Sequence, residues 1–515
     1  MSNMSNTKSS NTKRIIKNTI VLYARMIAIM VITLYSSRII LQALGINDYG
    51  LYNVVGGVVL MLAFLRSSLT SSTQRFLSFE MGRKDWIRLQ KVFSMSLTTH
   101  IIIALVIILL AETVGLWFLN TQIKIPEGRE IAANWIFQFS VFSLSVSMIT
   151  VPYHACTISH EKMSFFAWVS ILDAVLKLVF SFALLLTTSD RLILYGGLMM
   201  LTNIINLLLY WWYDRRYFEE TKYHFFWDKE LFKQIFSFSG WTIWGQMAVV
   251  GSAQGKNILV NIFYSVSANA AMGVAHQVNS AIVSLTSNFQ TAFQPQLTKS
   301  YAAKDYDYLN SLIVYASKVS FYLLFIVSLP FMLNIDWVLS VWLTEVPEYA
   351  GIFCILYIIA SILNALATPL WISIFATGKI KNYQITLSIA YITEITIIYV
   401  LFKLGFPPTT AMLVKVFLNA VMVIIRLIFA KKTVDCFSIS DYTRKVLLPI
   451  CLSSLIIMAF VYSLNMVVYS SFLQIIYTLT IIVLSVLTAF FIGLTKTERI
   501  SVIKIIFQFI NKKRL

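Results

Sequence analysis

Hydrophobic residues fill most of this chain in long runs that polar residues interrupt only briefly. Of 515 residues, 58% are hydrophobic and 12% are charged, and the mean hydropathy is +0.76. Apolar runs of about 20 residues recur along the whole length, and each can cross roughly 30 Å of hydrocarbon as a helix. None has the short alternating pattern of a membrane β-barrel strand. The pattern therefore predicts an all-α polytopic membrane protein.

The runs predict about fourteen transmembrane helices, joined as hairpins by short polar connections. The expected spans cover residues 16–37, 51–73, 92–115, 132–157, 165–187, 192–213, 234–262, 269–294, 310–333, 350–376, 382–402, 409–430, 446–468 and 472–494. The Ser/Asn-rich start has no small-residue cleavage site after the first run, so we expect a cytoplasmic tail and not a signal peptide. Most Lys and Arg residues fall in the connections on the side of this tail, which predicts that both termini are cytoplasmic.

The sequence resembles itself across its longest polar connection. Tyr23 aligns with Trp241, Arg38 aligns with Lys256, and the run 79–85 aligns with 299–305, which also ends in Lys-Asp. Each half begins on the same side of the membrane. We therefore expect two six-helix lobes in parallel orientation, related by a pseudo-two-fold axis along the membrane normal.

This repeat gives a predicted domain organisation. It comprises a cytoplasmic tail at 1–15, an N-lobe at 16–216, a cytoplasmic linker at 217–233, a C-lobe at 234–431, two extra helices at 446–494 and a basic tail at 495–515. The extra helices have no counterpart in the repeat, so we expect packing or docking helices. Apolar residues at helical spacing among the lysines of the last segment favour an amphipathic helix at the cytoplasmic interface. A disordered basic tail is the alternative.

Cations inside the apolar runs are the strongest functional signal. Arg25 and Arg66 lie well within the first two spans, and Arg38 and Lys256 lie near span ends. A charged residue at mid-bilayer costs roughly 2.5–3.5 kcal/mol, so such residues usually face a watery cavity or a partner. We predict that these four cations bind an anionic substrate. For Arg38 and Lys256, snorkelling to lipid head groups explains the position equally well.

Other polar residues within the spans suggest further roles. Asp173 and Lys177 have i, i+4 spacing on one helix, which predicts an internal ion pair first and a proton-coupling site second; Glu394 is another candidate for coupling. Hydroxyl and amide residues are enriched in the second and eighth spans, where they suit either helix packing or hydrogen bonding to a sugar. The candidates are Ser68, Ser71, Gln74, Gln277 and Asn288.

The sequence supplies no motif for enzymatic chemistry. The run 251–257 lacks phosphate-loop spacing, and the chain has neither a hydrolase elbow nor an HExxH motif. The His residues are scattered and the four Cys residues occur singly. We therefore predict no catalytic residues, no metal and no cofactor. The net charge of +18 is spread between spans, which argues against nucleic acid as a partner.

The N-terminal region resembles a known family. The basic tail, the span ending at Arg38, the turn Leu44–Tyr52 and the close of the second span on Gln74–Phe76 are similar to Wzx-type polysaccharide/O-antigen flippases. These form the polysaccharide-biosynthesis branch of the multidrug/oligosaccharidyl-lipid/polysaccharide (MOP) exporter superfamily. The resemblance implies a MATE-like fold with a central cavity, alternating access, and an undecaprenyl-diphosphate-linked glycan as substrate. In related lipid II flippases, helices 13 and 14 form a groove suggested to hold the lipid tail.

The resemblance also implies a bacterial inner membrane, membrane lipids as partners and contact with the polysaccharide polymerase machinery. The expected function is therefore translocation of a lipid-linked oligosaccharide to the outer leaflet. Two alternatives stay open. A MATE-type drug/cation antiporter would need acidic residues in its cavity, whereas basic residues are more numerous within these spans. A membrane glycosyltransferase or polymerase would need a large external domain, whereas the outward loops are short.

Overall fold

The computed structural model is all-helical and confirms the predicted fold class. It describes residues 2–60, 63–122, 125–187, 190–264, 266–343, 345–435, 437–465, 471–495 and 498–500, and in these ranges it has no β-strand. Within these described ranges, ten helices are long and apolar enough to cross a membrane. The remaining predicted spans also fall mainly on helices, but these helices are richer in polar residues or shorter.

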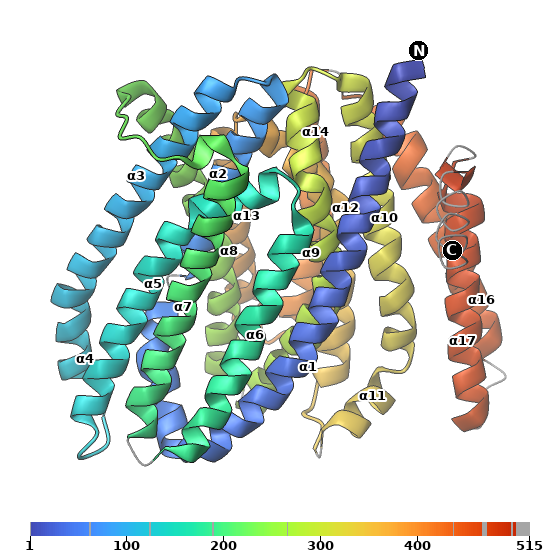
Figure 1. Ribbon diagram of the computed structural model, residues 1–515. Coiled ribbons are helices and arrows are strands. Elements are labelled where there is room, and N and C mark those ends of the chain that lie inside the picture. The colour runs from blue at the N-terminus through green and yellow to red at the C-terminus, as the bar shows by residue number, and fades with distance from the viewer. Residues whose placement is uncertain are drawn as a thin grey trace, which may run out of the picture. The chain divides into compact units, whose positions relative to one another are not determined.

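The chain divides into two compact units (Figure 1), Ile16–Met247 and Met1–Ile15 with Ala248–Leu515. We call the first the N-terminal unit and the second the C-terminal unit. The N-terminal unit contains most of α1 (Ser2–Leu60), followed by α2 (Ala63–Arg83), α3 (Trp86–Leu110), the π-helical η1 (Ala111–Gly115), α4 (Leu116–Gln122), α5 (Glu130–Ser159), α6 (Met163–Leu186), α7 (Arg191–Tyr217) and the short η2 (Glu219–Thr221).

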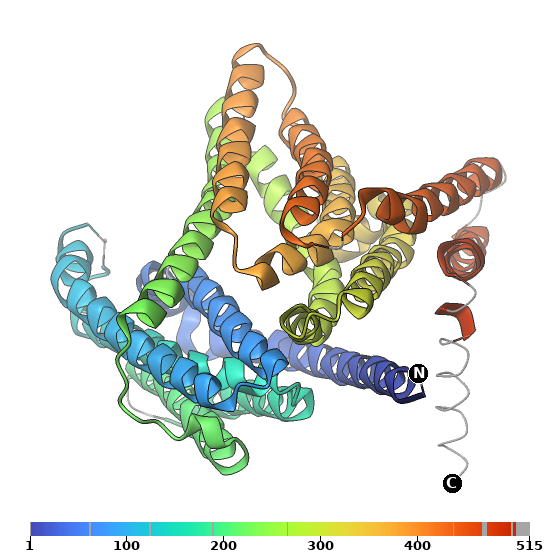
Figure 2. The same ribbon diagram turned by 90° about the horizontal axis from the view of Figure 1, so that it is seen from above.

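Helix α8 (Lys229–Phe263) carries the chain into the C-terminal unit. This unit continues with α9 (Val266–Ala302), α10 (Tyr306–Leu333), α11 (Ile335–Trp342), α12 (Ala350–Thr377), α13 (Lys381–Lys403), α14 (Thr410–Thr433), α15 (Ile439–Tyr442), the π-helical η3 (Thr443–Leu447), α16 (Leu448–Asn465), α17 (Ser471–Thr488) and η4 (Ala489–Gly493). Figure 2 shows the same helices from above.

The two units repeat the same helix packing. In the N-terminal unit α5 packs against α2, α3 and α7, and in the C-terminal unit α12 packs against α9, α10 and α14. The turns after α2 and α9 also match in detail. Lys84 and Lys304 have φ values of 59° and 56°, and the next residue in each turn, Asp85 or Asp305, caps the following helix through its carboxylate. This agreement confirms the internal repeat; the exact domain boundaries stay predictions.

A single glycine breaks α1 where the sequence suggested a longer turn. Gly45 has φ 74° and ψ 171°, whereas the residues on both sides of it are helical. This backbone conformation is essentially restricted to glycine, because a side chain would clash with the backbone. The predicted turn is therefore a sharp one-residue break between two helices that together make up α1. The break redirects the chain at the end of the first span.

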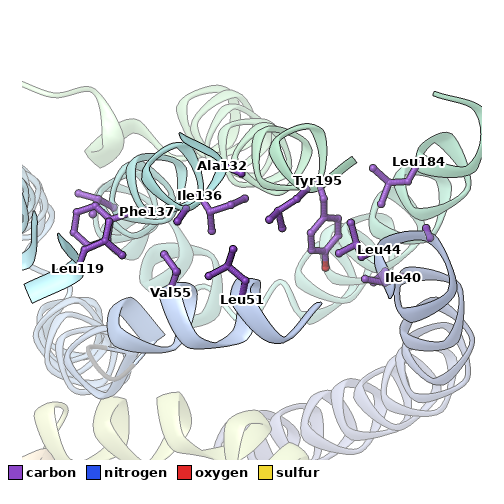
Figure 3. Close-up of a cluster of buried hydrophobic side chains, with 14 residues drawn as sticks. Ile40, Leu44, Leu51, Val55, Leu119, Ala132, Ile136, Phe137, Leu184 and Tyr195 are labelled. Carbon is purple, nitrogen blue, oxygen red and sulfur yellow. The ribbon is translucent and has the colours of Figure 1, made fainter. Parts of the chain in front are cut away.

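An apolar cluster fixes both parts of the broken helix in the N-terminal unit (Figure 3). Ile40 and Leu44 precede the break and Leu51 and Val55 follow it, and all four are buried in one cluster with residues of α4, α5, α6 and α7. Because lipid is as apolar as these side chains, close packing contributes more here than removal from water. Tyr195 of the same cluster also lines the cavity described below.

The helices after the repeat pack against α10, as expected of packing helices. Tyr322 of α10 forms a 2.9 Å hydrogen bond with Ser453 of α16, and fully buried Lys318 of α10 contacts Glu498 at 3.0 Å. The predicted amphipathic tail falls almost entirely on residues 501–515, outside the described residues.

Candidate functional site

A polar cavity of about 680 Å³ lies inside the N-terminal unit, lined by α1, α2, α5, α6 and α7. Its charged lining residues are Arg25, Arg66, Asp173 and Lys177, and all four are charges predicted from the sequence to lie within membrane spans. Helical spacing explains how α6 supplies two of them, because residues four positions apart share one face. The cavity thus brings together four side chains from three helices.

Arg25 faces the cavity from α1 with little support from other polar groups. Its guanidinium carbon lies 4.4 Å from the centre of the Phe166 ring, a cation–π distance. Its Nε is buried without a hydrogen-bond partner among the described residues. A half-buried guanidinium whose Nε donor is unsatisfied retains its capacity to bind an anion.

Arg66 lines the same cavity from α2, and its side chain is exposed within it. In the part of the chain that the structure describes, neither Arg25 nor Arg66 forms an ion pair with a carboxylate. The charge of Asp173 acts electrostatically on both arginines without an ion pair to either. The two guanidinium groups are therefore available to a ligand.

Asp173 already has two partners. Its Oδ2 accepts a hydrogen bond from Lys177 Nζ at 2.8 Å and its Oδ1 accepts one from Asn206 Nδ2 at 2.7 Å. The expected i, i+4 ion pair is thus present, while its role in coupling stays a prediction. Because three cations face one carboxylate, the cavity carries excess positive charge.

Hydroxyl groups complete the lining, and many of them donate to their own helix. Ser36 donates to the Ile32 carbonyl at 2.9 Å and Ser170 donates to the Phe166 carbonyl at 2.7 Å. A hydroxyl that donates back to its helix keeps its oxygen as an acceptor. The walls therefore offer acceptors for ligand hydroxyl groups beside the donors of the two arginines.

His154 and Tyr210 also line the cavity, although neither was predicted from the sequence to be a site residue. The His154 ring lies 5.1 Å from Phe166 and 5.6 Å from Tyr210, both edge-on. A lone His in an apolar run carries no distinctive spacing, so its neighbours across α6 and α7 were not visible in the sequence. Together the three rings form the wall behind the Arg25 guanidinium.

Lys256, another predicted substrate cation, lies in a different environment. In the C-terminal unit its Nζ is 2.7 Å from Glu394 Oε1 and donates to Ser252 Oγ at 3.1 Å, while Ser252 donates to Glu394 Oε2 at 2.5 Å. The side chains of Lys256 and Glu394 are 5% and 0% exposed. The nearby Lys415 ammonium lies 3.7 Å from the centre of the Tyr357 ring. Lys256 is therefore neutralised inside the protein.

The remaining predicted residues do not line the N-terminal cavity. Arg38 and Gln277 are exposed, Ser71 is half-buried, and Ser68, Gln74 and Asn288 are buried. Asn288 donates to the carbonyl of Ser284 within α9 at 2.8 Å. Their proposed contact with substrate stays a prediction.

Comparison with known proteins assigns the family and the fold. The family described as "Polysaccharide biosynthesis protein" matches residues 11–301. No curated protein sequence matches this chain.

Among solved structures, a mutant MATE protein is similar over 82% of this chain and 96% of its own, with 14% identity and a TM-score of 0.71. A MOP superfamily transporter from Pyrococcus furiosus covers 84% of this chain and 97% of its own, with 14% identity and a TM-score of 0.68. A mutant MATE transporter from Vibrio cholerae covers 84% of this chain and 99% of its own, with 13% identity and a TM-score of 0.69. At these identities the likeness establishes the fold alone. The chain is therefore a multi-pass membrane protein that belongs to the polysaccharide biosynthesis protein family and has a fold similar to that of MATE proteins.

Proposed function

We propose that this protein is a flippase that moves a polyprenyl-diphosphate-linked oligosaccharide from the cytoplasmic to the outer leaflet by alternating access. The observation that supports this function best is the basic cavity of the N-terminal unit. Arg25 and Arg66 line it without carboxylate partners among the described residues. Family membership supports lipid-linked glycan handling as the broader context.

The diphosphate is the part of the substrate that the two arginines recognise in this proposal. Guanidinium groups bind phosphate oxygens through paired, charge-assisted hydrogen bonds, which are roughly twice as strong as neutral ones. Because the prenyl tail is apolar, it stays in the surrounding lipid while the head group enters the cavity. The bound anion thereby offsets the cost of the partly buried Arg25 within its span.

The sugars need hydrogen-bond partners throughout their passage. Burying a hydroxyl without a partner costs roughly 2–7 kcal/mol, so an apolar pathway would stop an oligosaccharide. The serine and threonine oxygens of the cavity supply acceptors, and Asn203 and Asn206 supply amide groups. We assign energy coupling to proton or ion antiport, with Asp173, Lys177 and Glu394 as the candidate groups.

In this proposal the protein works in a bacterial inner membrane with both termini in the cytoplasm. It delivers its glycan to polysaccharide polymerase machinery on the outer face. Its predicted role is transport and not catalysis.

Export of surface glycan by a deletion strain carrying variants tests the proposal. Arg66→Ala, expressed in the membrane at the normal level, should abolish export and cause lipid-linked intermediates to accumulate. Arg66→Lys should retain part of the activity, because it keeps the charge and loses the paired donors. Arg216→Ala is the matched control and should leave export unchanged, since Arg216 is exposed at the end of α7 and outside the cavity. Normal glycan at the surface of the Arg66→Ala strain would contradict the proposal.

A MATE-type drug/cation antiporter is the second candidate, because the fold is compatible with it. Such a protein needs net negative charge around its ligand, whereas three cations and one carboxylate line this cavity. For the Pyrococcus furiosus transporter, reverse polarity of the binding pocket is taken to suggest a different function. The excess of cations here supports the same kind of argument. Resistance of the deletion strain to cationic dyes separates the candidates, since only loss of an antiporter should lower it.

A further inference from the structure

Three metal-ligating side chains meet at the end of α5, away from the arginine cavity. Cys156 lies on the last turn of this helix, His160 is the residue directly after its end, and Glu220 lies in η2, which follows α7. One ligand atom of each residue lies within 4.8 Å of the other two. Cys156 Sγ is 3.9 Å from Glu220 Oε1, and His160 Nε2 is hydrogen-bonded to the same oxygen.

We propose that Cys156, His160 and Glu220 form a Zn²⁺ site. A thiolate, an imidazole and a carboxylate are the ligand types that zinc prefers, at distances of about 2.3, 2.0 and 2.1 Å. Tetrahedral geometry at these distances separates the ligand atoms by roughly 3.3–3.6 Å. The sulfur–oxygen distance is already close to this value, and the His160–Glu220 contact has only to lengthen.

The surroundings leave room for a fourth ligand. A cavity of about 560 Å³ is lined by His160 and Glu220 together with residues of α3 and of the segment after α7. Three protein ligands with an open position for water is a common zinc arrangement. The cavity also gives the ion a route to the site without passing through the apolar core.

An aromatic ring orients one of the ligands. The ring of Phe218 stacks on His160 at 3.8 Å between centres with a 7° angle between planes, which fixes the orientation of the imidazole.

Binding of Zn²⁺ joins two distant parts of the N-terminal unit. Two ligands belong to the end of α5, whereas Glu220 belongs to the segment that leads toward α8. The hydrogen bond between His160 and Glu220 connects residues 60 positions apart. A bound ion replaces this one hydrogen bond with coordination bonds to both parts, and it should restrain the connection that follows α7.

Metal analysis of the full-length protein tests the site. The protein is purified in detergent with a tag that lacks histidine, equilibrated with ZnCl₂, desalted and measured by elemental mass spectrometry. The wild type should retain one Zn²⁺ per chain. His160→Gln and Glu220→Gln should each weaken binding by at least about 10-fold, the loss that even an outer-shell partner can cause. Retention of no Zn²⁺ by the wild type would overturn the proposal.

Co²⁺ substitution tests the thiolate directly. The wild type should show a sulfur-to-cobalt charge-transfer band that Cys156→Ser lacks, whereas Cys354→Ser, a buried cysteine on α12, should keep the band. An unchanged band in Cys156→Ser would contradict the site. Size-exclusion profiles show whether each variant folds. If a variant does not fold, the unfolding temperature of the wild type is measured in its place. Zn²⁺ should raise this temperature, and a chelator should reverse the rise. No rise overturns the proposal.

Discussion

The two repeated units hold their intramembrane charges in opposite ways. In the N-terminal unit, Arg25 and Arg66 line an open cavity and contact no carboxylate in the described ranges. In the C-terminal unit, Lys256 is buried and paired with Glu394 at 2.7 Å. The same helix packing therefore supports both a basic ligand cavity and a buried ion pair. This difference teaches that a cation within a span is evidence for a binding site only if no carboxylate of the protein already neutralises it.

The physical basis of this contrast is desolvation. A buried ammonium without a partner is costly, so Lys256 is stable only because Glu394 and Ser252 surround it. Arg66 avoids this cost because its side chain faces an open cavity. A paired cation has little remaining capacity to bind an anion. The N-terminal unit is therefore the better candidate for substrate binding.

Removal of the acidic partner should have the largest effect, and only in the C-terminal unit. Glu394→Gln leaves the Lys256 charge buried without a counter-charge and should destabilise the protein by about 3–5 kcal/mol. Asp173→Asn is the matched change in the N-terminal unit, where the Lys177 side chain is 44% exposed, and it should cost at most about 1 kcal/mol. Denaturant unfolding in one detergent measures both. Equal losses would remove the contrast between the units.

The glycine break in α1 belongs to the N-terminal unit, and its substitution should have the next largest effect. Gly45→Ala forces a side chain into a strained backbone region and should cost about 1–3 kcal/mol. Gly50→Ala is the control, because an added methyl group has nothing within 4 Å at either position and Gly50 has ordinary helical backbone. It should be neutral or stabilising. Similar unfolding temperatures for the two variants would show that the break does not depend on glycine.

An added carboxylate should give the cations of the N-terminal cavity an acidic partner, as Glu394 does for Lys256 in the C-terminal unit. Ser170 lines the cavity on α6, so Ser170→Asp places an acid among its cations. We expect binding of a short-chain polyprenyl diphosphate to weaken at least about 10-fold, or about 1.4 kcal/mol, by titration calorimetry. Ser340→Asp, on exposed α11, should leave binding unchanged. Unchanged affinity in Ser170→Asp would indicate that the diphosphate binds elsewhere.

Replacement of the aromatic ring beside Arg25 should have the smallest effect. Phe166→Leu keeps apolar volume and removes the ring that lies 4.4 Å from the guanidinium. A double-mutant cycle with Arg25→Gln should yield a coupling energy of about 0.5–2 kcal/mol in diphosphate binding. Additive effects would mean that the ring only fills space.

The sequence predicted the fold well because its main signals are local. Runs of apolar residues reveal spans without knowledge of their neighbours, and the repeat appeared in matching turns such as those ending at Asp85 and Asp305. The break at Gly45 was expected only as a longer turn. A turn motif does not specify how many residues separate the two helices that it joins.

The candidate site was partly predictable for the same reason. Arg25 and Arg66 were selected by their cost in lipid, and the Asp173–Lys177 pair by its spacing within one helix. His154 and Tyr210 were not selected, since neither carries an intramembrane charge. The zinc ligands were also missed, because Glu220 is 60 positions from His160 in the chain.

The sequence by itself determined that this protein spans the membrane repeatedly, that its halves match, and that several spans contain cations which need a partner or water. Only the tertiary structure decided which cations have partners. Lys256 and Glu394 are 138 positions apart, so no local pattern relates them. The physical reason is that the energy of a buried charge depends on what packs against it, and helix packing joins residues that are distant in sequence.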